Sequence, residues 1–307
     1  MARFAAALLA AFLAAVVSAA PAYAQSDAPI LSVGDYWTYR TNSTVAESFS
    51  FDGETTFTVL ARGPSLIAGS ASDVYRVAVR GGGSVTGGAS VSGFPVSVSG
   101  SWSLNGEEEF EADGLKVTYS FLDLRADGVA QPFAQKFLLH VVNTTIFVIR
   151  SDTWRFPIDV GSTGSVTRDF NTTEEGLIRY GSAADTWSSN GTGRHTVDYV
   201  VESLEPISVA AGTYDAYRVN ETWPDGRHAV SHFAPVAGND LLVESYNASD
   251  ERVARSELKS FRYQALEPAR FLGLSADLWA AVGAGAAVSG LLAWSIHRRR
   301  RPRSPPE

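Results

Sequence analysis

His228, His232 and Glu221 are the residues whose types could bind a metal ion or transfer a proton. The two histidines lie four residues apart, a spacing that chelates a metal ion on a helix. Here Trp223-Pro224-Asp225-Gly226 predicts a turn, and the histidines follow it on a strand. On a strand, residues four apart share a face but lie roughly 13 Å apart, too far to bind one ion directly. The remaining route is Glu221 across the hairpin from one histidine.

The length of that turn decides which face the histidines occupy. A two-residue loop at Asp225-Gly226 would place Glu221 on the same face as both histidines. A three-residue loop, Pro224-Asp225-Gly226, would pair Thr222 with His228 and move both histidines to the polar face. Proline at the second turn position and glycine at the left-handed position favour the three-residue loop. The sequence therefore favours a solvated polar face over a metal or catalytic site.

An acidic run at Glu109, Glu111 and Asp113-Gly114 resembles the start of a calcium-binding loop. The twelfth position of such a loop should be glutamate, and here it is Ser120. The same residues are fully explained by a hairpin, so we predict no metal at this run.

The chain lacks the short motifs that carry catalysis. It has no G-x-S-x-G, no G-x-x-x-x-G-K, no H-E-x-x-H and no cysteine. We therefore predict no catalytic residues, no cofactor and no bound metal. Aromatic residues remain, and most should be buried, but two exposed in one groove would mark a sugar or hydrophobic ligand site. They are Trp37, Tyr39, Trp102, Trp154, Trp187 and Trp223.

Six of the eight asparagines begin the N-x-S/T pattern of N-glycosylation. They are Asn42, Asn143, Asn171, Asn190, Asn220 and Asn247. Only Asn171 has an acidic residue two positions upstream, Asp169, which bacterial oligosaccharyltransferases usually require. Sequons without that acid, the absence of cysteine and an acidic composition together suggest an archaeal cell surface.

The elements that would position these residues are strands. Residues 96–104 alternate apolar side chains with serines, a period of two that indicates a half-buried strand. Asp113-Gly114 predicts a type I′ hairpin turn. That turn would pair Phe110 with Val117 on an apolar face, and Glu111 with Lys116 on a polar one.

The chain also repeats itself. Asp73-Val74-Tyr75-Arg76-Val77 matches Asp215-Ala216-Tyr217-Arg218-Val219 at an offset of 142, and Val33 to Trp37 has a weaker echo at Val160-Gly161-Ser162. We interpret this as two related β units.

Three segments resemble an uncharacterised family of secreted β-rich domains. Val33-Gly34-Asp35-Tyr36-Trp37 is similar to its G-D-x-W start, and residues 211–219 to its A-G-T-F/Y-x-A-x-x-V strand. His232-Phe233-Ala234-Pro235 resembles its Y-Y-A-P segment, with histidine for the first tyrosine. The resemblance covers mainly 206–263 and implies an antiparallel curved sheet or half-barrel, with no activity attached.

Both ends of the chain are typical of an exported, anchored protein. Arg3, an apolar run from Ala5 to Val17 and the cleavage site Ala22-Tyr23-Ala24 predict a signal peptide. Leu278 to Ile296 has no charged residue and precedes an arginine cluster, which predicts one transmembrane helix with a cytoplasmic tail. Small residues four apart in that helix favour self-association. They include Gly283, Gly285, Ala287 and Gly290.

Between residues 25 and 270 the chain is acidic, with 31 Asp and Glu against 19 Lys and Arg. This balance argues against nucleic acid or anionic lipid headgroups as partners. With no cysteine, the exported part depends on core burial and hydrogen bonding rather than disulfides.

The fold predicted is mainly β, as antiparallel curved sheets or half-barrels in two related units, plus one C-terminal transmembrane helix. The predicted parts are a signal peptide (1–24), a first β unit (25–155), a second β unit (156–264), a linker (265–277), the helix (278–296) and a basic cytoplasmic tail (297–307). We expect a plasma-membrane-anchored, N-glycosylated surface protein with a binding or envelope-structural role. A carrier of a lipid-like ligand and an extracytoplasmic hydrolase remain as alternatives. An apolar cavity would favour the carrier, and a cleft of convergent carboxylates or histidines would favour the hydrolase.

Overall fold

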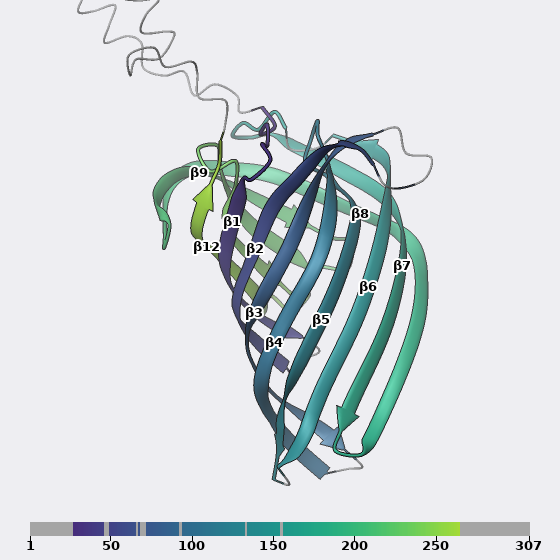
Figure 1. Ribbon diagram of the computed structural model, residues 1–307. Coiled ribbons are helices and arrows are strands. Elements are labelled where there is room, and N and C mark those ends of the chain that lie inside the picture. Colours follow the sequence, from purple (N-terminus) through teal and green to yellow (C-terminus); the bar gives the residue numbers. More distant parts are fainter. Residues whose placement is uncertain are drawn as a thin grey trace, which may run out of the picture. The chain divides into compact units, whose positions relative to one another are not determined.

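The computed structural model describes residues 27–45, 49–65, 67, 72–91, 94–132, 134–153 and 156–264. Within these ranges the chain forms twelve antiparallel strands that close into one barrel (Figure 1). The strands are β1 (Tyr36–Val45), β2 (Phe49–Pro64), β3 (Asp73–Val91), β4 (Phe94–Glu111), β5 (Val117–Gln131), β6 (Gln135–Asp152), β7 (Thr163–Tyr180), β8 (Ala183–Val209), β9 (Gly212–Thr222), β10 (His228–Ala234), β11 (Asn239–Tyr246) and β12 (Arg252–Arg262).

Each strand pairs with its sequence neighbours, and β1 pairs with β12 to close the barrel. The mainly β class is confirmed. The expectation of two separate half-barrels is wrong, because β6 pairs with β7 across the proposed boundary and β12 returns to β1. Closure satisfies the backbone groups that two open sheets would have left unpaired at their edges.

The strands differ greatly in length. β8 has 27 residues, whereas β10 has 7 and β11 has 8. Consequently β9 covers only the second part of β8, and residues 183–197 of β8 pair with β7 alone among the described strands. Figure 1 shows the long strands β4 to β8 along one side of the barrel.

The period of two seen in residues 96–104 places apolar side chains inside. Val96, Val98 and Trp102 on β4 are buried, while the serines between them are exposed. Buried side chains of this kind form three clusters inside the barrel. The first surrounds Trp37, Tyr75 and Leu258, the second Phe51, Val85 and Trp102, and the third Ile158, Tyr199 and Phe233.

The sequence repeat coincides with a repeat in strand register. In β2 and β3, Val59 pairs with Val77, a bulge follows, and Pro64 pairs with Asp73. In β8 and β9, Val201 pairs with Val219, a bulge follows, and Pro206 pairs with Asp215. The offset is 142 at every one of these positions.

The turns before β1 and β7 repeat as well. The Gly34 amide donates to the Val59 carbonyl at 2.9 Å, and the Gly161 amide donates to the Val201 carbonyl at 2.8 Å. Both glycines have a positive φ, 90° and 86°, which L side chains adopt only with strain. The chain is therefore one barrel whose two halves, β1–β6 and β7–β12, share strand registers.

The hairpin between β4 and β5 has a longer turn than predicted. Phe110 pairs with Val117, and the Lys116 ammonium lies 2.9 Å from the Glu111 carboxylate, so both predicted pairings are confirmed. The type I′ turn is wrong, because residues 112–115 form a four-residue loop in which Leu115 has a φ of 54°. The equivalent loop between β10 and β11 ends in the same conformation at Gly238, with a φ of 63°.

The predicted signal peptide, linker, transmembrane span and basic tail lie outside the described residues, as does Trp154. Within the described ranges, no helix is long and apolar enough to cross a membrane.

Candidate functional site

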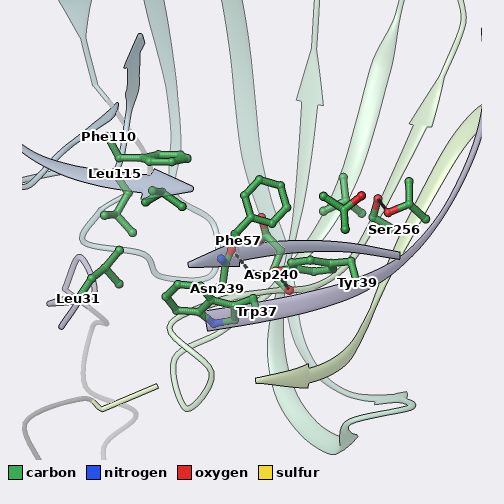
Figure 2. A pocket seen from close by; sticks show the side chains of 13 residues that line it. Leu31, Trp37, Tyr39, Phe57, Phe110, Leu115, Asn239, Asp240 and Ser256 are labelled. Carbon is green, nitrogen blue, oxygen red and sulfur yellow. Dashed lines mark hydrogen bonds between the residues drawn. The ribbon is translucent and has the colours of Figure 1, made fainter. Parts of the chain in front are cut away.

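A partly open cavity of about 360 Å³ lies inside the barrel, beside the strands where β1 meets β12 (Figure 2). Strands β1, β2 and β11 supply most of its wall, with single residues from β3, β4 and β12. Its lining residues are Leu31, Trp37, Tyr39, Thr41, Thr55, Phe57, Val77, Phe110, Leu115, Asn239, Asp240, Val243 and Ser256. This size lies within the range of small-molecule sites in proteins.

Alternation along β1 places three of these side chains on the inner face. Trp37, Tyr39 and Thr41 lie two residues apart, so all three point into the barrel. The Trp37 indole Nε1 donates to the Ala237 carbonyl at 2.7 Å, and the Tyr39 hydroxyl donates to the Asp240 carbonyl at 2.8 Å. These bonds satisfy the polar atoms of both rings and leave their apolar faces to the cavity.

The cavity has an apolar end and a hydroxyl-bearing end. Figure 2 shows Leu31, Phe110 and Leu115 at one end and Ser256 at the other. Ser256 pairs with Thr41 across β12 and β1, and their hydroxyl oxygens lie 3.5 Å apart. Between the ends, the Tyr39 and Phe57 rings pack edge to face with their centroids 5.9 Å apart. An elongated amphipathic molecule would match this gradient.

The charges near the cavity are acidic. Asp240 is the one aspartate or glutamate in the wall, and the described lining includes no lysine, arginine or histidine. Glu108 lies beside the wall, directly opposite Val77 on the inner face. Burial raises the pKa of Glu108, and a hydrogen bond donated by the Ser120 hydroxyl at 3.1 Å opposes this shift.

The position equivalent to Phe110 in the second half of the barrel is filled. Phe233 is the register equivalent of Phe110, since Tyr75 pairs with Phe110 and Tyr217 pairs with Phe233. The Phe233 side chain is 1% exposed, and its ring lies 5.2 Å from Phe156 in an edge-to-face contact. Phe110 is only half-buried and borders the cavity. The cavity therefore follows from the side chains at this place and not from the shared strand registers.

The histidines singled out from the sequence do not form a site. His228 pairs with Thr222, as the three-residue loop predicts, so both histidines lie on the outer face and Glu221 on the inner one. His228 stacks on Tyr246, with ring centroids 4.6 Å apart. The predicted solvation is wrong for His232, which is 5% exposed. Its Nε2 lies 3.5 Å from Glu205, and burial lowers the pKa of its imidazole.

The acidic run is likewise structural. Glu111 pairs with Lys116, as described above, and Glu109 is buried and accepts a hydrogen bond from the Ser65 hydroxyl at 2.6 Å. Within the described residues, no three His, Cys, Asp or Glu side chains are grouped to hold a metal ion.

Sequence reasoning missed a charged cluster inside the barrel. Arg168 on β7 donates from Nε to the Nδ1 of His195 at 3.4 Å, and its guanidinium lies 4.4 Å from the centroid of the Phe147 ring. Burial lowers the pKa of Arg168, and the nearby Glu221 carboxylate opposes this shift. These residues do not line the cavity.

The six sequon asparagines occupy different environments. Asn42, Asn171 and Asn190 are exposed on the outer face, whereas Asn143 lies on the inner face and donates to the Thr172 hydroxyl at 3.3 Å. The other two are half-buried: the Asn220 amide nitrogen lies 3.4 Å from the Glu202 carboxylate, and the Asn247 side chain bonds Glu251 in a turn. The positions differ in how easily a glycan could attach.

Comparisons with known proteins add little to this geometry. No family model and no curated protein matches the chain. Among solved structures, a Bacteroides fragilis protein assigned as exported and of YmcC-like fold aligns at 10% identity and a TM-score of 0.29. The alignment covers 77% of this chain and 99% of that one. A TM-score of this size does not define a common fold, so the function must come from the site itself.

Proposed function

We propose that this chain is an exported, membrane-anchored barrel protein that holds a small hydrophobic ligand in the cavity lined by β1, β2 and β11. The observation that carries the proposal is the cavity of about 360 Å³, lined mainly by aromatic and aliphatic side chains. A protein gains stability from filling such a space, and the equivalent position around Phe233 is filled, because Phe156 packs against that ring. This is the carrier alternative, which an apolar cavity favours over the leading interpretation of a binding or envelope-structural role.

The hydrolase alternative lacks a comparable observation. Among the described residues, the cavity wall has one carboxylate, Asp240, and no histidine to act with it. The export signal, the anchor and the sequons remain predictions from the sequence. The signal and the anchor together would place the barrel, and with it the cavity, on the extracytoplasmic side of the membrane.

A photolabelling experiment tests the proposal. The full-length protein in lipid nanodiscs is irradiated with decanol and, separately, with decanoic acid, each carrying a diazirine in its chain. Two probes are used so that the result does not depend on one head group. We expect labelled peptides to come from the lining strands β1, β2, β11 and β12.

Two matched variants identify the site. Val243→Phe with Ser256→Phe adds two rings on the inner face, where these residues pair across β11 and β12. Leu242→Phe with Glu257→Phe adds the same rings to the neighbouring outer-face pair. We expect labelling to fall at least tenfold in the inner variant and to stay within twofold in the outer one, with both barrels folded by circular dichroism. Labelling that is spread over the barrel, or equal in the two variants, would overturn the proposal.

A further inference from the structure

The hydroxyl-bearing end of the cavity has unused hydrogen-bonding capacity. Thr55 is 8% exposed, lines the cavity, and its hydroxyl makes no hydrogen bond within the described residues. The Thr41 and Ser256 hydroxyls meet each other at 3.5 Å, the outer limit of a hydrogen bond. Each hydroxyl can donate once and accept twice, so all three have capacity left for a further partner. A polar group on the ligand would satisfy these side chains.

The charges around this end argue that the polar group is neutral. A carboxylate or phosphate would need a cation or several N–H donors, and the described wall includes no lysine, arginine or histidine. Asp240 adds an acidic residue to the wall, which disfavours an anion further. An ammonium head would have to lose its hydration in a largely apolar site for a single carboxylate partner, a balance that is rarely favourable.

We propose that the ligand is a neutral single-chain amphiphile, with a hydroxyl-class head at Thr55, Thr41 and Ser256 and its chain toward Phe110 and Leu115. At about 30 Å³ for each non-hydrogen atom, the cavity accommodates about twelve such atoms, the size of a ten-carbon alcohol. This inference depends on the proposed function, because it names the ligand class of the same cavity.

Competition against the photolabel tests the head group. 1-Decanol, decanoate and decylammonium are compared at pH 7 by the free concentration that halves cavity labelling of the full-length protein in nanodiscs. We expect decanol to act at a concentration at least tenfold lower than either charged competitor. If decanoate or decylammonium matches or surpasses decanol, the neutral-head inference is wrong, while ligand binding in the cavity still stands. If neither photolabel reacts in the cavity, both proposals fall.

Removing one hydroxyl tests its role directly. Thr55→Val deletes the cavity hydroxyl, and Thr56→Val deletes the next one along β2, which faces outward and bonds Thr38. We expect Thr55→Val to raise the half-displacement concentration of decanol about fivefold, the equivalent of one hydrogen bond, and to leave that of 1-chlorodecane unchanged. Thr56→Val should leave both within twofold.

Each competitor partitions into the lipid equally in the assays of variant and wild type, so this effect cancels in the ratio of their half-displacement concentrations. If Thr55→Val does not fold, Ser256→Ala gives the same comparison at the adjoining hydroxyl. Decanol displacement that is unchanged in the folded hydroxyl variant would overturn the assignment of the head group to this end.

Discussion

Phe233 and Phe110 occupy equivalent positions in the two halves of the barrel, so replacing each by alanine compares a filled core with a hollow one. Phe233 is 1% exposed and packs against Phe156, whereas Phe110 is half-buried and borders the cavity. The two substitutions remove the same atoms. Any difference between them therefore reports how tightly each half is packed.

Phe233→Ala should lower the free energy of unfolding by about 3–5 kcal/mol, because it removes buried surface and leaves a new void. Phe110→Ala should lower it by about 1–2 kcal/mol, because about half of the ring's burial is lost and an existing cavity is enlarged. For a chain of this length, 1 kcal/mol corresponds to about 2–4 °C in Tm. The expected decreases are thus about 6–20 °C for Phe233→Ala and about 2–8 °C for Phe110→Ala.

Thermal unfolding of the full-length protein in nanodiscs, followed by far-ultraviolet circular dichroism at one scan rate, measures both decreases. Phe110→Ala should also reduce cavity photolabelling, while Phe233→Ala should preserve it below its own Tm. Equal decreases in Tm would mean that the first half is packed as tightly as the second, and the reasoning from the cavity would fail.

Three further predictions concern other parts of the chain. Burial raises the pKa of Glu108, so its contribution to stability is full at low pH and is lost as the pH rises through the folded-state pKa. Glu108→Gln should therefore raise the Tm at pH 8 and leave it unchanged at pH 4, and equal values at pH 8 would contradict the shift. Gln substitutions at the exposed sequons should lower the apparent mass stepwise, whereas Asn143→Gln on the inner face should not; a native mass equal to that of the bare polypeptide would mean that no sequon is occupied. Changing three glycines of the predicted anchor to leucine should abolish crosslinked dimers of the full-length protein, and unchanged crosslinking would reject helix association; these are Gly283, Gly285 and Gly290.

Local sequence patterns were sufficient to predict strand faces and hairpin registers, because short-range geometry decides these features. Alternation along residues 96–104 identified the buried face of β4, because side chains on a strand point to opposite faces. The proline and glycine of the β9–β10 turn set the register of His228 against Thr222. The register of Phe110 against Val117 was also predicted, although the turn that joins them is two residues longer than expected.

Features that depend on distant residues were not predictable. Closure pairs Trp37 with Phe261, and neither segment carries a signal for the other. The same limit applies to His232, whose outer-face position was predicted but whose burial was not. The cavity was not predictable either, because its existence depends on how completely side chains from several distant strands fill the interior of the barrel. The alternation of Trp37, Tyr39 and Thr41 was present in the sequence, yet it is equally typical of a filled core.

The comparison of the two halves explains where the hollow comes from. The shared turns before β1 and β7 place Leu31 and Ile158 at equivalent positions, and each packs in the core cluster of its own half. Two residues earlier the second half has Phe156, which covers Phe233, whereas the first half has Pro29. The first half thus has no aromatic ring at the position from which Phe156 packs on Phe233, and Phe110 borders the cavity. A framework that repeats its registers but not the side chains packed on them can keep one part of the core closed for stability and leave another available to a ligand.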